Sequence, residues 1–300
     1  MILRMAQIAP MLPRDEDAGV RRGVQHAAIV RREGGREISA EDFLAVEEPL
    51  EIQLEYGPPV DRATKPISVT MRTPGHDDEL AAGFLMTEGV VTDSGDIKAI
   101  THTAQNVVRV ELTEAVVVKA TSLERNFYVT SSCGVCGKAS LLALQTACPP
   151  RRSNHFRIRE DTLRSLPERL RRQQTLFNRT GGLHAAALFD VAGNLCSVRE
   201  DVGRHNAVDK LIGNEWLADR TPLHHRLLLL SGRASFELLQ KAVMAGIPMV
   251  ACVGAPSSLA VAIARQFDVI LTGFLREDSF NIYHGAERID TNTPSCDGLR

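Results

Sequence analysis

The sequence predicts a mixed α/β fold, in which a three-layer α/β/α sandwich follows a strand-rich N-terminal part. Two observations lead to this fold class. The first 120 residues consist mainly of alternating apolar and polar stretches, which are typical of strands. From Thr180 onward, short apolar runs alternate with stretches of helical length, the pattern of strand–helix–strand units.

The composition is that of a globular protein rather than of a nucleic-acid or membrane protein. Hydrophobic residues make up 44% and charged residues 24% of the 300 residues, and the net charge is −2. No apolar run approaches the roughly 18 residues of a membrane span, and Arg4 and Pro10 interrupt any leader-like apolar run. We therefore expect a cytoplasmic protein that neither binds nucleic acid nor inserts into a membrane.

The six cysteines are too few for a disulfide-based scaffold and fit a reducing compartment. Cys196 and Cys252 lie in apolar, strand-like runs, so we expect both to be small core residues.

The N-terminal half is expected to contain strands joined by antiparallel connections. Residues 1–40 show no periodicity and predict a flexible tail. A helix of about 14 residues is expected from His76, because three acids in its first turn suit the helix dipole. The expected strands are Glu48–Tyr56, Ile67–Met71, Val107–Leu112 and Ala115–Lys119.

A cysteine-containing loop over residues 121–138 leads into a helix-like run over Ala139–Ala147. The basic stretch Arg151–Arg172 is expected at the surface, with a short helix over Asp161–Leu170. We expect four segments: a tail (1–40), a strand-rich part with the cysteine loop (41–150), an α/β/α part (151–290) and a C-terminal tail (291–300).

The second half predicts parallel strands with right-handed crossovers. We expect the N-terminal half to contribute an antiparallel part to this architecture. The expected strands are Leu183–Phe189, Leu195–Val198, Leu227–Leu230, Met249–Val253 and Val269–Leu271, and the expected helices are Asp201–Ala218, Ser235–Ala245 and Ser257–Phe267.

Cys133-Gly134-Val135-Cys136-Gly137 is the first candidate site. Two thiols before a helix N-terminus lie where free N–H groups and the helix dipole favour the reactive thiolate. The glycines add backbone freedom. This pattern is typical of redox or sulfur chemistry, but half of a zinc site and two incidental thiols are open alternatives.

The carboxyl ends of parallel strands form the second candidate site, since ligands collect there in open sheets. Small-residue loops lead from two of these ends into helices, and a third end carries an arginine. Together they predict a nucleotide-like polyanionic ligand. Taken alone, Ser235 and Ser257 are equally open as ordinary N-caps. The three ends are Ser231–Ser235, Gly254–Ser258 and Thr272–Arg276.

Two further polar stretches flank these ends. Arg204 and His205 begin a predicted helix and are able to hold phosphates or bases; a solvated helix start capped by Asp201 is the alternative. His184 follows a glycine pair at the start of an apolar strand, so a core histidine and a catalytic one are both open.

Several catalytic classes lack their motifs. Zinc deaminases carry H-x-E followed by P-C-x-x-C, whereas here His184-Ala185-Ala186 lacks the glutamate and the cysteine pair lies upstream. A second C-x-x-C, a Walker loop and a GxGxxG motif are absent from the sequence, so we expect neither a four-thiolate zinc site nor ATP hydrolysis.

These stretches, taken in order, resemble the FdhD family, the accessory sulfurtransferases of formate dehydrogenases. The resemblance covers about Glu47 to Arg288. The matching stretches are Cys133–Gly137, Thr180–Ala186, Glu200–Lys210, Ser231–Ser235, Gly254–Ala260 and Thr272–Arg276.

The resemblance implies a fold like that of the cytidine deaminases and a homodimer. It also implies an enzyme that receives persulfide sulfur from a cysteine desulfurase and passes it to the bis-molybdopterin guanine dinucleotide cofactor of formate dehydrogenase, which GDP would mimic. Cys133 would carry the persulfide and Cys136 would assist. No resident metal is expected.

The resemblance and the strand ends together give the expected cofactor-binding residues. This chain has Glu277, Asp278 and Ser279 where family members often have Gly or Arg, so we expect backbone rather than side-chain contacts there. The expected set is Phe274, Leu275, Arg276, Glu277, Asp278, Ser279, Ser231, Gly232, Arg233, Arg204, His205 and His184.

Two other functions stay open at this point. A thiol–disulfide oxidoreductase would use the same cysteines without a cofactor, and a cofactor-binding chaperone would do no chemistry. The oxidoreductase would not need the three polar strand ends after Ser231.

Overall fold

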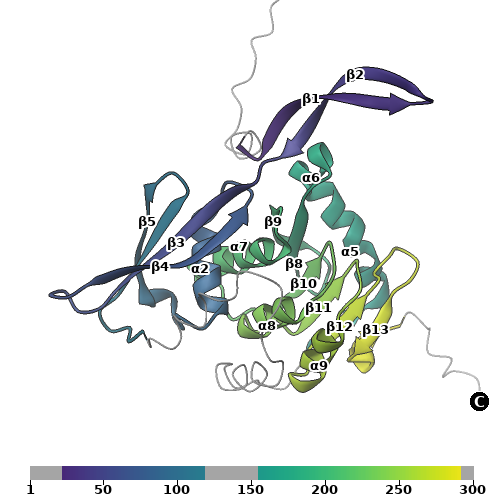
Figure 1. The fold of residues 1–300 in the computed structure, drawn as a ribbon. Helices are drawn as coiled ribbons and strands as arrows, with labels where there is room; N and C mark the ends of the chain where they lie inside the picture. Colours follow the sequence, from purple (N-terminus) through teal and green to yellow (C-terminus); the bar gives the residue numbers. More distant parts are fainter. Residues whose placement is uncertain (1–21, 119–154, 292–300) are drawn as a thin grey trace, which may run out of the picture.

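The computed structural model describes residues 22–118 and 155–291, which form three parts (Figure 1). A two-stranded ribbon projects from the molecule, a four-stranded sheet lies to one side, and a six-stranded sheet with its helices forms the remainder. This arrangement confirms the predicted mixed α/β fold. In these two ranges, no helix combines the length and the apolar character needed to cross a membrane.

The six-stranded sheet has the order β13-β12-β11-β10-β8-β9. Its middle strands β10, β11 and β12 are parallel, as predicted, whereas β8, β9 and β13 pair antiparallel. The short middle strands are buried throughout, because helices cover both faces. The strands are β8 (His184–Phe189), β9 (Leu195–Asp201), β10 (Leu227–Leu230), β11 (Met249–Cys252), β12 (Ile270–Gly273) and β13 (Asn281–His284).

Helices pack on the two faces of this sheet and complete three layers, as predicted. Leu228 and Leu230 join the core under α7, α8 and α9, whereas Leu227 and Leu229 join the core under α5, because successive strand residues point to opposite faces. The elements are α5 (Glu160–Gln173), α6 (Thr175–Thr180), α7 (Arg204–Leu217), α8 (Phe236–Met244), α9 (Ser258–Gln266), η2 (Ala286–Arg288) and the paired strands β7 (Ile158–Arg159) and β14 (Ile289–Asp290).

The four-stranded sheet has the order β4-β3-β6-β5 and packs on α2. Leu50, Ile52 and Leu54 of β3 are buried there, which confirms the alternation seen in the sequence. The elements are β3 (Glu48–Tyr56), β4 (Ala63–Arg72), α2 (Asp77–Thr87), η1 (Ser94–Asp96), β5 (Ile97–Ala104) and β6 (Val107–Leu112).

Three expectations about the N-terminal half are wrong. Residues 24–40 are not a tail but belong to a ribbon of β1 (Val24–Glu33) and β2 (Arg36–Ala45), joined by Gly34 and Gly35 with positive φ. Residues 115–118 form no strand; Val116 and Val118 pack against the core of the four-stranded sheet instead. The N-terminal half builds its own sheet, so β8, β9 and β13 supply the antiparallel part of the larger one.

Several other expectations lie outside the described residues. These are the cysteine loop over 121–138, the following helix and both chain ends. Apart from the corrected boundary of the N-terminal tail, the expected segment boundaries stay predictions.

A close backbone contact between α2 and α7 joins the two sheets. A Cβ on Gly83 would lie 1.9 Å from the Asp209 carbonyl oxygen, and a Cβ on Gly213 would lie 1.9 Å from that of Glu79. Both distances are far below any tolerable contact, so only glycine fits at either position. The two helices therefore touch through their backbones.

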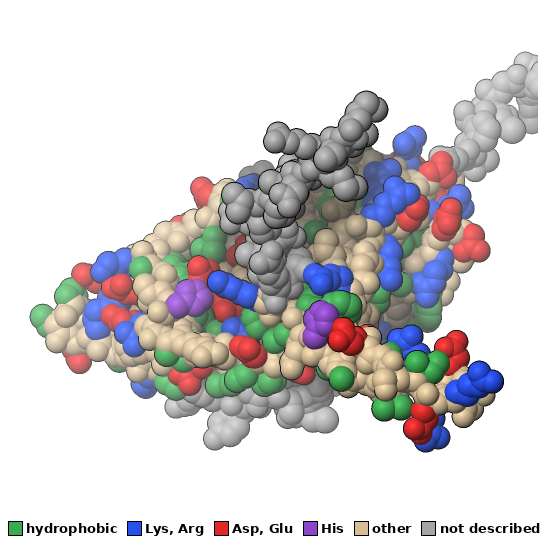
Figure 2. Space-filling model, turned by 90° about the horizontal axis from the view of Figure 1, so that it is seen from above, with side chains coloured by type: hydrophobic (Ala, Val, Ile, Leu, Met, Phe, Trp, Pro, Cys, Tyr) green, Lys and Arg blue, Asp and Glu red, His purple; other side chains and the backbone are tan. Residues whose placement is uncertain are grey.

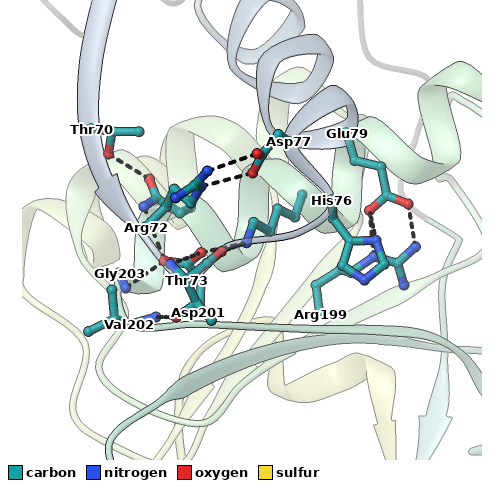
Figure 3. A network of polar contacts seen from close by, with 12 residues as sticks. Thr70, Arg72, Thr73, His76, Asp77, Glu79, Arg199, Asp201, Val202 and Gly203 are labelled. Atoms are coloured by element: carbon teal, nitrogen blue, oxygen red, sulfur yellow. Dashed lines mark hydrogen bonds and ion pairs between the residues drawn. The ribbon is translucent and has the colours of Figure 1, made fainter. Parts of the chain in front are cut away.

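A buried ion pair fixes the same junction (Figure 3). The Asp201 carboxylate at the end of β9 lies 2.7 Å from Lys210 Nζ and accepts a hydrogen bond from the Thr73 N–H at 3.1 Å. It also accepts bonds from the Gly203 N–H and the Asn206 amide, at 2.8 and 3.1 Å. Lys210 Nζ donates to the Thr73 carbonyl at 2.8 Å. Because every charge is compensated, this pair is tolerated in the interior.

A second buried cluster ties α8 to the same helices. Lys241 Nζ lies 2.9 Å from Asp209 Oδ1 and donates to Thr87 Oγ1 at 3.0 Å. Burial acts to lower the pKa of Lys241, but the Asp209 and Glu88 carboxylates outweigh it and raise that pKa. Lys241 therefore stays charged and connects α8 with α2 and α7.

We predict that Gly213→Ala lowers the free energy of unfolding by about 3 kcal/mol, because the added methyl group must displace backbone. Because alanine has the higher helix propensity, a loss of stability on replacing glycine by alanine would come from the close backbone contact. Urea denaturation followed by circular dichroism measures it. Gly182→Ala, at a glycine without positive φ where an added Cβ would come no closer than 3.4 Å to its neighbours, serves as the control and should change stability little. A Gly213→Ala protein as stable as the wild type would show that the helices do not meet so closely.

Candidate functional site

The three polar strand ends predicted from the sequence lie side by side at one edge of the six-stranded sheet. The Ser231 N–H donates to the Ala185 carbonyl at 3.0 Å, and the Gly254 N–H donates to the Gly232 carbonyl at 2.8 Å. The Phe274 N–H in turn donates to the Gly254 carbonyl at 2.9 Å. These bonds place residues following β10, β11 and β12 in one continuous edge, which we call the rim.

Two glycines allow the rim loops to approach each other. A Cβ on Gly254 would lie 2.9 Å from the Gly232 carbonyl, and a Cβ on Gly232 would lie 3.2 Å from the His184 ring. The Ser231 hydroxyl accepts a hydrogen bond from the Ala185 N–H at 2.8 Å and holds the start of β8 against the first loop. His184 therefore lies against the rim instead of in the sheet interior.

Basic side chains gather around His184. Its pKa is lowered by burial first, and then by the positive charges of Arg204, His205 and Arg233, which outweigh the opposing charge of Asp201. Arg204 Nε is buried and makes no hydrogen bond within the described residues. Such a cluster has a positive potential and unused donors, so it is suited to bind an anion.

His205 is oriented by two groups at the start of α8. Its Nε2 atom lies 3.4 Å from Ser235 Oγ and 3.7 Å from Glu237 Oε2. The contact with His205 lowers the pKa of Glu237 to about 2, although partial burial opposes this shift. Glu237 therefore stays ionised beside the ring. Glu237 is not among the residues predicted from the sequence, although its place in the first turn of a helix that begins at the rim is a usable signal.

The two serines that were open as N-caps differ. Ser257 Oγ accepts a hydrogen bond from the Ala260 N–H at 3.2 Å and caps α9. Ser235 occupies the N-cap position of α8 without a side-chain cap and faces His205 instead. Only the Ser257 hydroxyl is thus committed to a helix end.

The last predicted segment, Phe274–Ser279, lies at the far end of the rim. Arg276 Nη1 donates to the carbonyls of Val253 and Leu275, at 2.7 and 3.0 Å, which fixes the guanidinium beside β11. Phe274 has a positive φ of 52° and is 45% exposed, whereas Leu275 is fully buried. Glu277 and Asp278 line a shallow hollow with Arg164 of α5 and with Arg276.

Other residues of the polar stretch Glu200–Lys210 make structural hydrogen bonds and do not line the rim. Glu200 accepts hydrogen bonds from the N–H groups of Leu176 and Phe177, at 2.9 and 2.8 Å, and so caps α6. Asn206 donates to the Met71 carbonyl at 2.8 Å. Only Arg204 and His205 contribute to the basic cluster, because their neighbours are committed to the junction below it.

The four cysteines discussed in the sequence analysis have different positions. Cys133 and Cys136 lie outside the described residues. Cys252 is buried, as expected, and burial raises its pKa to about 12. The expectation for Cys196 is wrong: it is exposed, because β9 is the edge strand of its sheet. Residues 22–118 and 155–291 contain no cluster of three metal-binding side chains.

The comparisons with known proteins agree with one another. The model of the FdhD/NarQ family matches residues 45–290. The sulfur carrier protein FdhD of Streptomyces avermitilis is 47% identical over 293 residues, covering 92% of this chain and 99% of that protein. The protein of the same name from Sulfolobus acidocaldarius is 41% identical over 267 residues, covering 89% and 99%.

A solved structure has the same fold. The crystal structure of a candidate formate dehydrogenase accessory protein from Desulfotalea psychrophila matches with a TM-score of 0.69, covering 89% of this chain and 99% of that one at 23% identity. The likeness to cytidine deaminases stays a prediction. With a family model that spans most of the chain and relatives near half identity, this protein belongs to the FdhD/NarQ family.

Proposed function

We propose that this protein is a sulfur carrier. Family membership supports the role, since relatives that match about nine-tenths of the chain carry that name. The observation that carries the proposal is the basic cluster of Arg204, His205 and Arg233 at the strand ends of such a chain. A cationic rim suits an acceptor that bears phosphates.

The sulfur would travel as a persulfide on Cys133. A cysteine desulfurase would supply the outer sulfur, and the Cys136 thiolate would then attack the inner sulfur of the Cys133 persulfide. The sulfur–sulfur bond of the persulfide breaks and the outer sulfur leaves as hydrosulfide with the electron pair. It is thereby reduced, while the two cysteines are oxidised to a disulfide. A cellular thiol must reduce this disulfide before the next cycle.

The acceptor would be the bis-molybdopterin guanine dinucleotide cofactor, bound as a substrate in transit. Its diphosphates would face Arg204 and Arg233, and N–H groups of the loops after β10 and β11, other than those that already donate to neighbouring carbonyls, would complete the contacts. Arg276 is fixed by backbone carbonyls and would shape the far end of the site. GDP carries the same guanosine and diphosphate and serves as a probe.

The name of the structural neighbour suggests formate dehydrogenase as the final recipient. A sulfurtransferase of this kind would act as an accessory enzyme, meeting the desulfurase and the dehydrogenase in turn. A cytoplasmic location fits the reducing environment that the thiols need.

We predict that Cys133→Ala abolishes sulfur loading. Intact-mass spectrometry after incubation with free cysteine and a cysteine desulfurase should show the wild type gaining one sulfur atom and the variant none. Cys196→Ala removes an exposed thiol and is the matched control, which should load normally. Full loading of Cys133→Ala would contradict the assignment, and loading lost equally in both variants would also contradict it.

We predict that Arg233→Gln weakens GDP binding about tenfold, because a charge-assisted contact to a phosphate is lost. Isothermal titration calorimetry of the full chain measures the change. The control is Arg172→Gln on α5, where the exposed arginine pairs with Glu168. Equal affinity of Arg233→Gln and the wild type would place the nucleotide elsewhere.

We predict a pH-dependent difference between the wild type and His184→Gln. The pKa of His184 is lowered, so its ring is neutral near pH 7 and gains a charge only as the pH falls below the ordinary histidine range. GDP affinity of the wild type should therefore rise relative to that of His184→Gln between pH 7 and about pH 5. Comparing the two proteins cancels the titration of GDP itself. If the ratio of the two GDP affinities did not change with pH, His184 would not contribute to GDP binding.

A further inference from the structure

Glu237 is an acid at the edge of the basic cluster on the rim. It is the second residue of α8, and its side chain is 51% exposed. His205, which adds positive charge near His184, lies 3.7 Å from the Glu237 carboxylate. This carboxylate is therefore only one side chain away from the groups that suit a phosphate.

The acids that precede α7 are committed to the fold, whereas Glu237 is not. The Glu200 carboxylate caps α6, and that of Asp201 binds Lys210 in the interior. The Glu237 side chain instead stays at the surface of the rim, where a ligand has access to it. Its role in the protein is thus not explained by packing or by a helix cap.

Glu237 also does not pair with the arginines of the rim. Acidic and basic side chains lie next to one another over much of the surface (Figure 2), and pairs such as Arg172 with Glu168 are common among them. Within the described residues, however, Glu237 forms its ion pair with His205 and with neither Arg204 nor Arg233. The carboxylate and the two guanidinium groups are therefore available to different parts of one ligand.

The hydrogen-bonding groups of the base decide which nucleotide fits this arrangement. An ionised carboxylate only accepts hydrogen bonds, and its two oxygens suit two adjacent donors. Guanine offers such a pair on its Watson–Crick edge, the N1–H and the N2 amino group. Adenine and cytosine place an unprotonated ring nitrogen beside their amino group, and its lone pair is repelled by a carboxylate. Uracil offers a single N–H between two carbonyls.

We propose that Glu237 is the residue that selects guanine. Its carboxylate accepts hydrogen bonds from N1–H and from the N2 amino group, while the diphosphate of the same nucleotide faces Arg204 and Arg233. His205 and Ser235 contact the carboxylate and restrict its movement. The assignment rests on the proposed function, because it concerns the acceptor bound at the rim, and it adds the group that distinguishes one base from another.

A different role for Glu237 would be to orient His205 alone. Removing the carboxylate would then weaken all nucleoside diphosphates alike, since His205 would act on the phosphates that they share. A carboxylate that reads the base affects only those ligands that carry the guanine donors. The two roles therefore predict different affinity patterns across nucleotides with the same diphosphate.

Isothermal titration calorimetry of the full chain with GDP, inosine diphosphate and ADP tests the assignment. Inosine diphosphate is GDP without the N2 amino group, so the wild type should bind it about tenfold more weakly than GDP, and ADP more weakly still. Glu237→Gln should lose about tenfold in GDP affinity and should bind GDP and inosine diphosphate with similar affinity. The reason is that the amide replaces one acceptor oxygen by a donor.

The matched control is Glu37→Gln on the ribbon, which breaks an exposed ion pair with Arg32. It should bind all three nucleotides as the wild type does, since such pairs contribute little. Pyrophosphate is a further probe because it has no base. Glu237→Gln should bind it at least as tightly as the wild type, which would also show that the rim is folded in this variant.

Two results would overturn the selection of guanine by Glu237. One is an unchanged preference for GDP over inosine diphosphate in Glu237→Gln, or no such preference in the wild type. The other is an equal loss of affinity for GDP, inosine diphosphate and ADP, which would assign Glu237 the orienting role. Neither contradicts the proposed function as long as Arg233→Gln weakens GDP binding. A wild type that binds neither GDP nor pyrophosphate would contradict the proposed function and this inference together.

Discussion

The backbone contact between α2 and α7 is the constraint on which the rest of the structure depends. At Gly83 and Gly213 the carbonyl of one helix fills the space that a Cβ would need on the other. Asp201 then binds Lys210 and the Thr73 backbone in the same junction, so that a buried charge locks the contact. Together these interactions hold the four-stranded and six-stranded sheets as one unit and fix the start of α7.

The polar stretch at the start of α7 divides between the junction and the rim. The side chains of Asp201, Asn206 and Lys210 lie in the junction with β4 and α2, where they make hydrogen bonds. Arg204 and His205 then face the ends of the parallel strands, where Arg233 adds a third basic group. The buried network therefore orients the basic side chains of the rim without being part of the rim itself.

The sequence predicted much of this architecture, and its failures have physical causes. Strand β10 and the strand-end loops were predicted from apolar runs that stop at glycine and serine. The apolar run predicts the strand, and the small residues after it predict where the strand ends. The ribbon was missed because exposed arginines hide its alternation, although Gly34-Gly35 marked the turn. The roles of Gly83, Asp201 and Lys210 depend on contacts between segments more than 100 residues apart, which no local pattern reveals.

The most direct measurement of the central claim is hydrogen–deuterium exchange of the full chain with and without GDP. If the junction presents a cationic rim to a nucleotide diphosphate, GDP should slow exchange in residues 202–206, 231–235 and 254–258. Exchange in β5, which lies in the four-stranded sheet away from the rim, should not change. Protection confined to the four-stranded sheet, or no protection at saturating GDP, would contradict the claim.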